Sequence, residues 1–341
     1  MTGGKAIEER AAVTPARAMW WRYAVVGGVL IVFLALVTTF THGAFLDPGN
    51  LVNVLRQITY NAVLAAGQTF VIVTAGIDLS VGSLVSLCGV VMAMAANALP
   101  FHGIVLVGVV LLIGAAVGAI AGYINALPVV RLGLPPFITT LAMMLMARGL
   151  AYKLSHGRPI ALNSDAFNTI GIGFTLRGLG HLLQMPGIPV AVLWMAVVLI
   201  VSGIVLARTR FGRYVYAIGG NPEAARLAGI PTRGVVTAVY VISGICAAIA
   251  SLLLMARFQS GSPQTGYGFE LTVIAAVVVG GTSLFGGSGT IAGTFIGALL
   301  IGVLNNVMNL ANVESYTQDI ALGAVILLAL ILDQLRKRIW Q

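Results

Sequence analysis

The hydrophobic pattern of this chain is a series of long apolar runs separated by short polar connections. A helix needs about 20 apolar residues to cross a bilayer, and on that measure the sequence predicts about ten membrane segments. They cover residues 23–41, 54–75, 79–98, 103–127, 136–155, 187–207, 234–256, 271–285, 289–311 and 317–335. We therefore expect an all-α fold, a polytopic transmembrane helical bundle.

Two polar, glycine-rich stretches interrupt this pattern. One is AGIDLSVGS at residues 75–83 and the other is VGGTSLFGGSGT at residues 279–290. Non-helical backbone persists at membrane depth only where protein or a water-lined cavity satisfies its polar groups, so both stretches predict broken or re-entrant helices that face the bundle interior. Close helix packing by small residues is the alternative. The two stretches hint at a duplicated half, although their similarity is too weak to establish a repeat.

Composition and charge support the membrane assignment. Hydrophobic residues make up 59% of the chain and charged residues 9%, which is far too apolar for an average soluble domain. Cytoplasmic loops collect Lys and Arg, and placing both termini in the cytoplasm puts 13 of the 19 basic residues on that side. They lie in the tail 1–22, at Arg131, in the loop 208–233 and in the tail 336–341, which leaves residues 23–335 as a single transmembrane domain.

The net charge of +9 is thus explained by orientation in the lipid bilayer, and no nucleic-acid partner is needed. Cys88 and Cys246 lie in apolar runs and are interpreted as small packing residues. The sequence predicts no catalytic residue, no metal site and no cofactor.

The central polar loop contains the stretch GNPEAARLAGI at residues 220–230. Asn221 is a good helix N-cap, Pro222 suits the first helical position and Glu223 complements the positive helix end. Gly229 can take the left-handed conformation that ends a helix. The loop therefore predicts a helix of about two turns, either lying at the membrane surface or docking on another protein.

Several amide side chains fall within the apolar spans. Asn61 and Gln68 lie seven residues apart, on one face of a helix, and a second group follows late in the chain: Asn305, Asn306 and Asn309. Such amides either line a polar translocation path or join helices by hydrogen bonds, and the sequence leaves both interpretations open.

Asp78 is a carboxylate at membrane depth, where a charge is costly and usually functional. It is a second kind of candidate for the translocation path. Capping of the following helix, by accepting from backbone N–H groups near Ser80 and Val81, is the favoured interpretation.

Four motifs give the chain a resemblance to a known family. They are GIDLSVGS at 76–83, PPFITTLAMMLMARGLA at 135–151 followed by GRPI at 157–160, EAARLAG at 223–229, and AVVVGGTSLFGGSGT at 276–290. Over nearly its whole length the chain resembles the membrane permeases of bacterial ABC importers of the ribose and xylose type. Asn125-Ala126 and Ala142 depart from the family pattern, which often has glycine at positions 126 and 142, and this weakens the substrate assignment more than the family.

The resemblance implies that the loop helix is a coupling helix, which docks on a separate cytoplasmic ABC ATPase. No G-x-x-x-x-G-K-[ST] sequence occurs, so the chain has no P-loop of its own. Glu223 and Arg226 would make the polar contacts, and Ala224, Ala225 and Leu227 would seat the helix in a groove. The whole coupling segment is Asn221, Pro222, Glu223, Ala224, Ala225, Arg226, Leu227, Ala228 and Gly229.

The resemblance also implies a location in the bacterial inner membrane and two further partners. A periplasmic sugar-binding protein would deliver a monosaccharide or related polyol, and a second permease subunit, identical or a sister chain, would complete the importer. The outer segments 156–186 and 257–270 are long enough to receive the binding protein. Arg158, Arg177 and Arg257 are candidates to meet its acidic patches, with interfacial anchoring as the alternative for each.

Two other function classes fit parts of the sequence. An ion-coupled secondary transporter of small polar solutes would suit the broken helices, yet it would normally carry acidic or histidine relays within its spans. Apart from Asp78, the acids lie at span ends, in loops or in the N-terminal tail. Gly286-Gly287-Ser288-Gly289 matches the G-x-S-G of rhomboid-like serine proteases, but no histidine lies in a later span to activate the serine. The sequence therefore favours the ABC permease and leaves the sugar undetermined.

Overall fold

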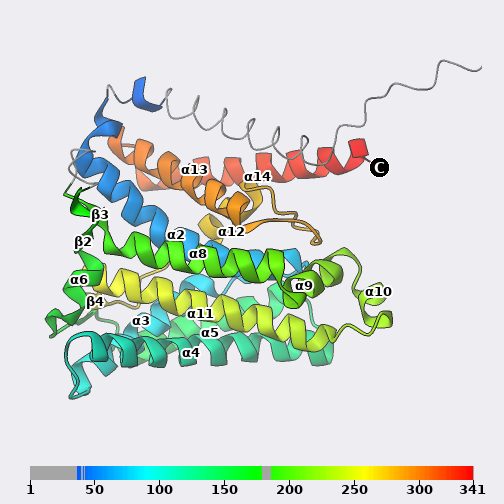
Figure 1. The fold of residues 1–341 in the computed structure, drawn as a ribbon, viewed down its shortest axis with the longest axis horizontal. Helices are drawn as coiled ribbons and strands as arrows, with labels where there is room; N and C mark the ends of the chain where they lie inside the picture. Colours follow the sequence, from blue (N-terminus) through cyan, green and yellow to red (C-terminus); the bar gives the residue numbers. More distant parts are fainter. Residues whose placement is uncertain (1–36, 40, 42, 179–185, 341) are drawn as a thin grey trace, which may run out of the picture. The chain divides into compact units, whose positions relative to one another are not determined.

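The computed structural model describes residues 37–39, 41, 43–178 and 186–340. The described residues up to Asp47 belong to a separate unit, in which the short 3-10 helix η1 spans Ala44–Leu46. The predicted first span, 23–41, lies almost wholly outside the described residues. From Pro48 onward the chain forms a second unit built almost entirely of helices (Figure 1), as the all-α prediction requires.

The long helices of this second unit follow the predicted segments, with shifted ends. They are α2 (Pro48–Val73), α3 (Val81–Ala98), α4 (Gly103–Leu132), α5 (Pro136–Leu154), α8 (Val190–Arg208), α11 (Thr232–Phe258), α12 (Phe269–Val279), α13 (Ile291–Leu310) and α14 (Ser315–Trp340). In the described part of the chain, six helices are long and apolar enough to cross a membrane: α3, α4, α5, α8, α11 and α13.

The predicted count of about ten full segments is not confirmed. The helix α12 has 11 residues and ends at Val279, whereas the predicted span ran from 271 to 285. At the carboxyl end, α14 continues to Trp340, so the predicted span 317–335 and much of the predicted tail 336–341 form one helix.

Short elements occupy the two ends of the bundle (Figure 1). At one end lie η2 (Asp165–Phe167), α6 (Asn168–Gly171) and four short strands, β1 (Ile160–Ala161), β2 (Phe174–Thr175), β3 (Ile188–Pro189) and β4 (Ser260–Gly261). The strands pair antiparallel, β1 with β4 and β2 with β3. At the other end lie α9 (Arg210–Gly220) and α10 (Pro222–Leu227).

The helix α11 lies at the centre and packs against α4, α2 and α3. Its contact with α4 is a backbone contact, because a Cβ added to Gly118 would overlap the carbonyl oxygen of Gly244, and the reverse holds as well. Gly122 approaches the carbonyl of Tyr240 in the same way. Small residues thus bring these two helices together at close range, as in other membrane bundles.

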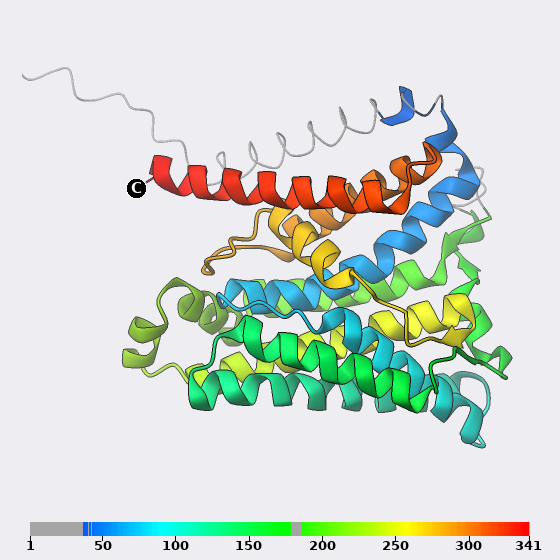
Figure 2. The ribbon, with the colours of Figure 1, turned by 180° about the vertical axis from the view of Figure 1, so that it is seen from behind.

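The first glycine-rich stretch is a true helix break. Residues 74–80 are not helical, and Asp78 and Ser80 are fully buried, as predicted for an interior segment. In Figure 2 the chain turns back from the end of α2 into the bundle, so that α3 starts part-way along it. The predicted break is therefore confirmed, and its backbone lies inside the bundle.

The second stretch also separates two helices, α12 and α13. Thr282 and Ser283 are buried, but Phe285 is 60% exposed, and the connection lies at the α9 end of the bundle (Figure 1). The predicted helix break is therefore present and only partly interior: Gly281, Phe285, Ser288 and Thr290 are exposed, and the other residues of 279–290 are buried or half-buried.

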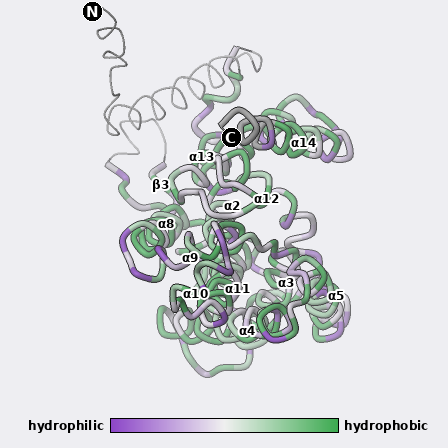
Figure 3. Tube along the Cα trace, turned by 90° about the vertical axis from the view of Figure 1, so that its right-hand side faces the viewer, coloured by the Kyte–Doolittle hydropathy of each residue, from purple (hydrophilic) through white to green (hydrophobic). Residues whose placement is uncertain are grey.

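The outer faces of several helices are apolar. Exposed large hydrophobic side chains follow α4, α5 and α8 and include Ile104, Leu112, Leu145, Met146, Ile200 and Ile204. Figure 3 shows hydrophobic colour along most of the helices and hydrophilic colour mainly in the connections. Such surfaces suit contact with lipid chains and support a multi-pass membrane protein.

The α4–α11 contact makes a prediction about stability. Gly118→Leu should destabilise the fold by about 1–3 kcal/mol or more, because the side chain has no room between the backbones. Gly108→Leu is the matched control on the same helix, since nothing lies near a Cβ at Gly108. Thermal unfolding of the detergent-solubilised protein measures both variants, and equal midpoints would contradict the close contact.

Candidate functional site

The predicted loop helix is present as α10, with the expected end signals. Asn221 accepts a hydrogen bond from the Ala224 N–H at 2.9 Å through its side-chain oxygen, and Pro222 occupies the first turn. At the other end Gly229 has φ +78, and the Ile230 N–H donates to the Ala225 carbonyl at 3.1 Å. These are the bonds of a Schellman motif, so both ends of the helix are fixed by local chemistry.

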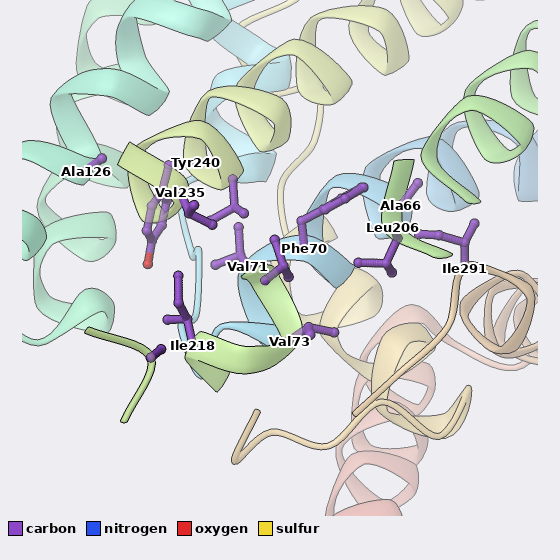
Figure 4. Close-up of a cluster of buried hydrophobic side chains, with 13 residues drawn as sticks. Ala66, Phe70, Val71, Val73, Ala126, Leu206, Ile218, Val235, Tyr240 and Ile291 are labelled. Carbon is purple, nitrogen blue, oxygen red and sulfur yellow. The ribbon is translucent and has the colours of Figure 1, made fainter. Parts of the chain in front are cut away.

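One side of α10 packs against the interior of this chain. Ala225 is 4% exposed and belongs to a buried apolar cluster with Ile218, Val235 and Tyr240. Figure 4 shows Ile218, Val235 and Tyr240 gathered in this cluster with residues of α2. The expectation that Ala225 seats the helix in a partner's groove is therefore wrong, because its methyl group already packs against its own core.

The opposite side of α10 is open. Leu227 is 74% exposed, and Pro222 and Ala224 are exposed as well. Glu223 and Arg226 pair with each other, with Arg226 Nη2 2.6 Å from Glu223 Oε1. The hydrogen bond from Arg226 lowers the pKa of Glu223. The exposed side of α10 thus presents the Glu223–Arg226 ion pair next to the exposed side chain of Leu227.

The sequence interpretation missed the helix α9, which precedes α10 within the predicted loop 208–233. Thr209 caps it by accepting from the Gly212 N–H at 3.1 Å. The signal was present in the spacing of Phe211, Val215 and Ile218, which recur on one face of a helix. Val215 and Ile218 are buried, so α9 is anchored to the bundle.

Asp78 lies at the centre of a buried polar cluster. Its Oδ1 accepts from the Ser80 N–H at 2.9 Å and from the Ser80 hydroxyl at 2.6 Å. Its Oδ2 accepts from the Ser243 hydroxyl of α11 at 2.9 Å. The Asn125 amide of α4 donates to Ser80 Oγ at 2.9 Å. The expected bond from the Ser80 N–H is present, but α3 begins at Val81 and has no side-chain capping bond. The carboxylate thus holds Ser80 in front of α3 and joins it to α11.

The neighbouring backbone of this break is satisfied by α5. Thr140 Oγ1 accepts from the Leu79 N–H at 3.1 Å, and the Thr140 hydroxyl also lies 3.1 Å from the Ile77 carbonyl oxygen. Thr140 is fully buried. A side chain of one helix therefore takes the place of the missing helical partners on both sides of Asp78.

The structure separates the predicted amides into two groups. Asn306 of α13 forms a reciprocal pair with Asn50 of α2, at 2.7 and 3.0 Å, and Asn309 accepts from Gln318 of α14 at 2.9 Å. Both contacts join helices, which favours the structural interpretation for these two residues. Asn305 is half-buried on the same helix.

Asn61 and Gln68 of α2 differ from this group. Both are buried, and Gln68 is wholly inaccessible. The side-chain oxygen of Asn61 and both polar atoms of Gln68 have no hydrogen-bond partner among the described residues. Buried polar groups are normally paired, so these atoms are suited to meet a polar solute or water.

The three predicted docking arginines lie on the side of the bundle that carries the strands. Arg158 and Arg177 are exposed. Arg257 is half-buried, with its guanidinium 5.6 Å from the ring centroid of Phe258. The sequence interpretation missed Arg56 of α2, which lies within electrostatic range of Arg257 and stacks over Phe174 at 5.1 Å.

The predicted outer segment 257–270 is only partly a surface segment. After β4 the chain enters the bundle, where Ser86 of α3 and Arg148 of α5 donate to the Pro263 carbonyl at 2.7 and 2.9 Å. The ring of Phe269, at the start of α12, stacks on Tyr60 of α2 at 5.4 Å. The segment is therefore mixed: Gly261, Pro263 and Gly266 are buried, whereas Phe258 and Tyr267 are exposed.

Comparison with known proteins identifies the family. The model of a family described as the permease component of the branched-chain amino acid transport system matches residues 50–330. The chain belongs to this permease family. The ribose import permease protein RbsC of Escherichia coli K12 is 43% identical to it over 308 residues, which cover 89% of this chain and 91% of the relative.

Further relatives have similar coverage. The ribose import permease of Bacillus subtilis is 40% identical over 88% of this chain and 89% of its own. The xylose transport system permease protein XylH of Escherichia coli K12 is 36% identical over 91% of each chain. No solved structure matches the permease. The family makes the chain a membrane transport subunit and not an enzyme.

The Asp78 cluster makes a prediction about the permease. Asp78→Ala should lower stability by about 1–3 kcal/mol or more, because buried donors on Ser80 and Ser243 lose their acceptor. Asp78→Asn should lose much less, since its amide oxygen still accepts from Ser80 and its NH₂ can donate to Ser243 Oγ. Unfolding midpoints in detergent test this order, and equal losses in both variants would show that the negative charge itself is required.

Proposed function

We propose that this permease is the membrane subunit of a bacterial ABC importer and forms the path for a monosaccharide or related polyol. Its main support is the 43% identity to a ribose import permease over 89% of the chain. An L-arabinose ABC transporter permease of Azospirillum brasilense is 36% identical over 96% of the chain, and the xylose relative agrees in class. An ion-coupled secondary transporter finds no support among these relatives.

In this proposal α10 is the coupling helix and its partner is a cytoplasmic ABC ATPase on a separate chain. The exposed face formed by Glu223, Ala224, Arg226 and Leu227 makes the contact. Ala225 serves a different role, since its burial ties the helix to the core of the permease. A rigid helix with one face on the ATPase and one face on the bundle can transmit a displacement between them.

The translocation path in this proposal uses the unpaired amides of α2. Asn61 and Gln68 offer donors and acceptors that sugar hydroxyls require, on a helix that contacts α11, α12 and α13. Asp78 holds the start of α3 next to this path. Asn305 is the remaining candidate on α13 for contact with the sugar. Asn306 and Asn309 hold α13 to its neighbours.

The opposite end of the bundle would face the periplasm and receive the sugar-binding protein. Its paired strands bring the segments 160–161 and 260–261 together, and Arg158, Arg177 and Arg257 supply positive charge for acidic patches on that protein. We further propose that both termini lie in the cytoplasm of the bacterial cell and that a second permease subunit completes the importer in the inner membrane.

Uptake assays test the proposed function. Disruption of the gene in its own organism should abolish binding-protein-dependent uptake of one of three radiolabelled sugars, ribose, xylose or arabinose, and a plasmid copy should restore it. Uptake should stop when ATP is depleted while the proton gradient is maintained. Persistence of uptake under ATP depletion would favour the ion-coupled transporter instead.

The open face of α10 makes a further prediction. In proteoliposomes that contain the permease with its ATPase and binding protein, Glu223→Arg should reduce sugar uptake by about tenfold or more, because like charges then meet at the coupling contact. Glu223→Gln is the control, since it also removes the ion pair with Arg226 but adds no positive charge. An equal effect of both variants would show that loss of the ion pair, and not the reversed charge at the contact, causes the defect.

A further inference from the structure

Three segments that are distant in the sequence meet at one point, where their backbones are in direct contact without intervening side chains. Gly219, near the end of α9, packs so closely on α2 that an added Cβ would overlap the carbonyl oxygen of Val73. The same carbonyl accepts a hydrogen bond from the Gly287 N–H at 2.9 Å. Val73 is the last residue of α2, so the contact lies where the first helix break begins.

The glycine-rich connection between α12 and α13 supplies the third segment. Gly286 and Gly287 have φ +81 and +75, values that only glycine adopts without strain. An added Cβ on Gly286 would lie 2.8 Å from the Gly219 carbonyl oxygen. The Tyr216 hydroxyl of α9 donates to the Gly289 carbonyl at 2.7 Å. The end of α9 therefore touches both helix breaks.

No flexible linker separates this junction from the coupling helix. Gly220 is the last residue of α9, and the next residue, Asn221, caps α10 while its own N–H donates to the Ala217 carbonyl at 3.1 Å. The apolar cluster that holds Ala225 also contains Ile218 and Val73 (Figure 4). A displacement of α10 must therefore move the Gly219 contact.

We propose that the Gly219–Val73–Gly287 junction is the positioning element that carries movement of the coupling helix to the two helix breaks. The inference rests on the proposed function and adds the route of coupling to it. Backbone atoms in direct contact have no rotamers to absorb a displacement, so a shift of α9 pushes on the end of α2 and on the glycine hairpin. Moving the end of α2 changes the start of the re-entrant segment that leads to Asp78.

The adjacent residue provides a matched control. Gly219→Ala places a methyl group against the Val73 carbonyl, whereas Gly220→Ala places the same group one residue further along α9, where nothing lies within 4 Å of it. Both variants are compared with the wild type in proteoliposomes containing the ATPase and binding protein. The readouts are uptake of radiolabelled ribose, xylose and arabinose, and ATP hydrolysis stimulated by the binding protein.

We expect Gly219→Ala to reduce sugar imported per ATP hydrolysed by about tenfold, the range of an allosteric coupling, and Gly220→Ala to leave this ratio unchanged. Equal ratios for the two variants and the wild type would overturn the junction and leave the proposed function intact. Absence of uptake of all three sugars by the intact wild-type complex would overturn both.

A milder variant covers the case in which Gly219→Ala does not assemble with the ATPase. Tyr216→Phe removes the hydrogen bond to Gly289 and should lower the same ratio about two- to tenfold. Tyr214→Phe is its control, because the Tyr214 hydroxyl has no hydrogen bond among the described residues. Equal ratios for these two variants would overturn the proposal.

Discussion

The fold depends on the requirement that every backbone polar group inside a membrane finds its partner within the protein. The first helix break meets this requirement with its own Asp78 side chain and with side chains from two other helices, α5 and α11. Asp78 accepts from Ser80 and Ser243, and Thr140 bridges the backbone on either side of it. The break is thereby tied to α5 and α11, and α3 can start inside the bundle.

Features that arise from neighbouring residues were predictable from the sequence. The ends of α10 follow from Asn221, Pro222 and Gly229, whose preferences are local. The bond from the Ser80 N–H to Asp78 follows from their distance of two residues in the chain. The apolar runs likewise predicted most long helices, because a run of about 20 apolar residues typically forms a membrane-spanning helix.

Features that arise from tertiary contacts were not predictable in this way. The burial of Ala225 depends on the cluster formed with Ile218 and Val235, and no local pattern distinguishes it from Ala224. The burial of Pro263 depends on the donors Ser86 and Arg148, which lie far away in the sequence and bond to its carbonyl. The helix α9 was missed for a different reason. Its arginines were interpreted only as cytoplasmic charge, although Phe211, Val215 and Ile218 recur at helical spacing.

The glycine contact between α4 and α11 has a consequence for how the bundle can change shape. Gly118 and Gly244 let the two backbones touch because neither residue has a side chain. A slide of one helix along the other would bring a larger side chain into the space between the backbones. A slide of α4 along α11 is therefore opposed by steric overlap at this contact, whereas surfaces where side chains form the boundary can repack.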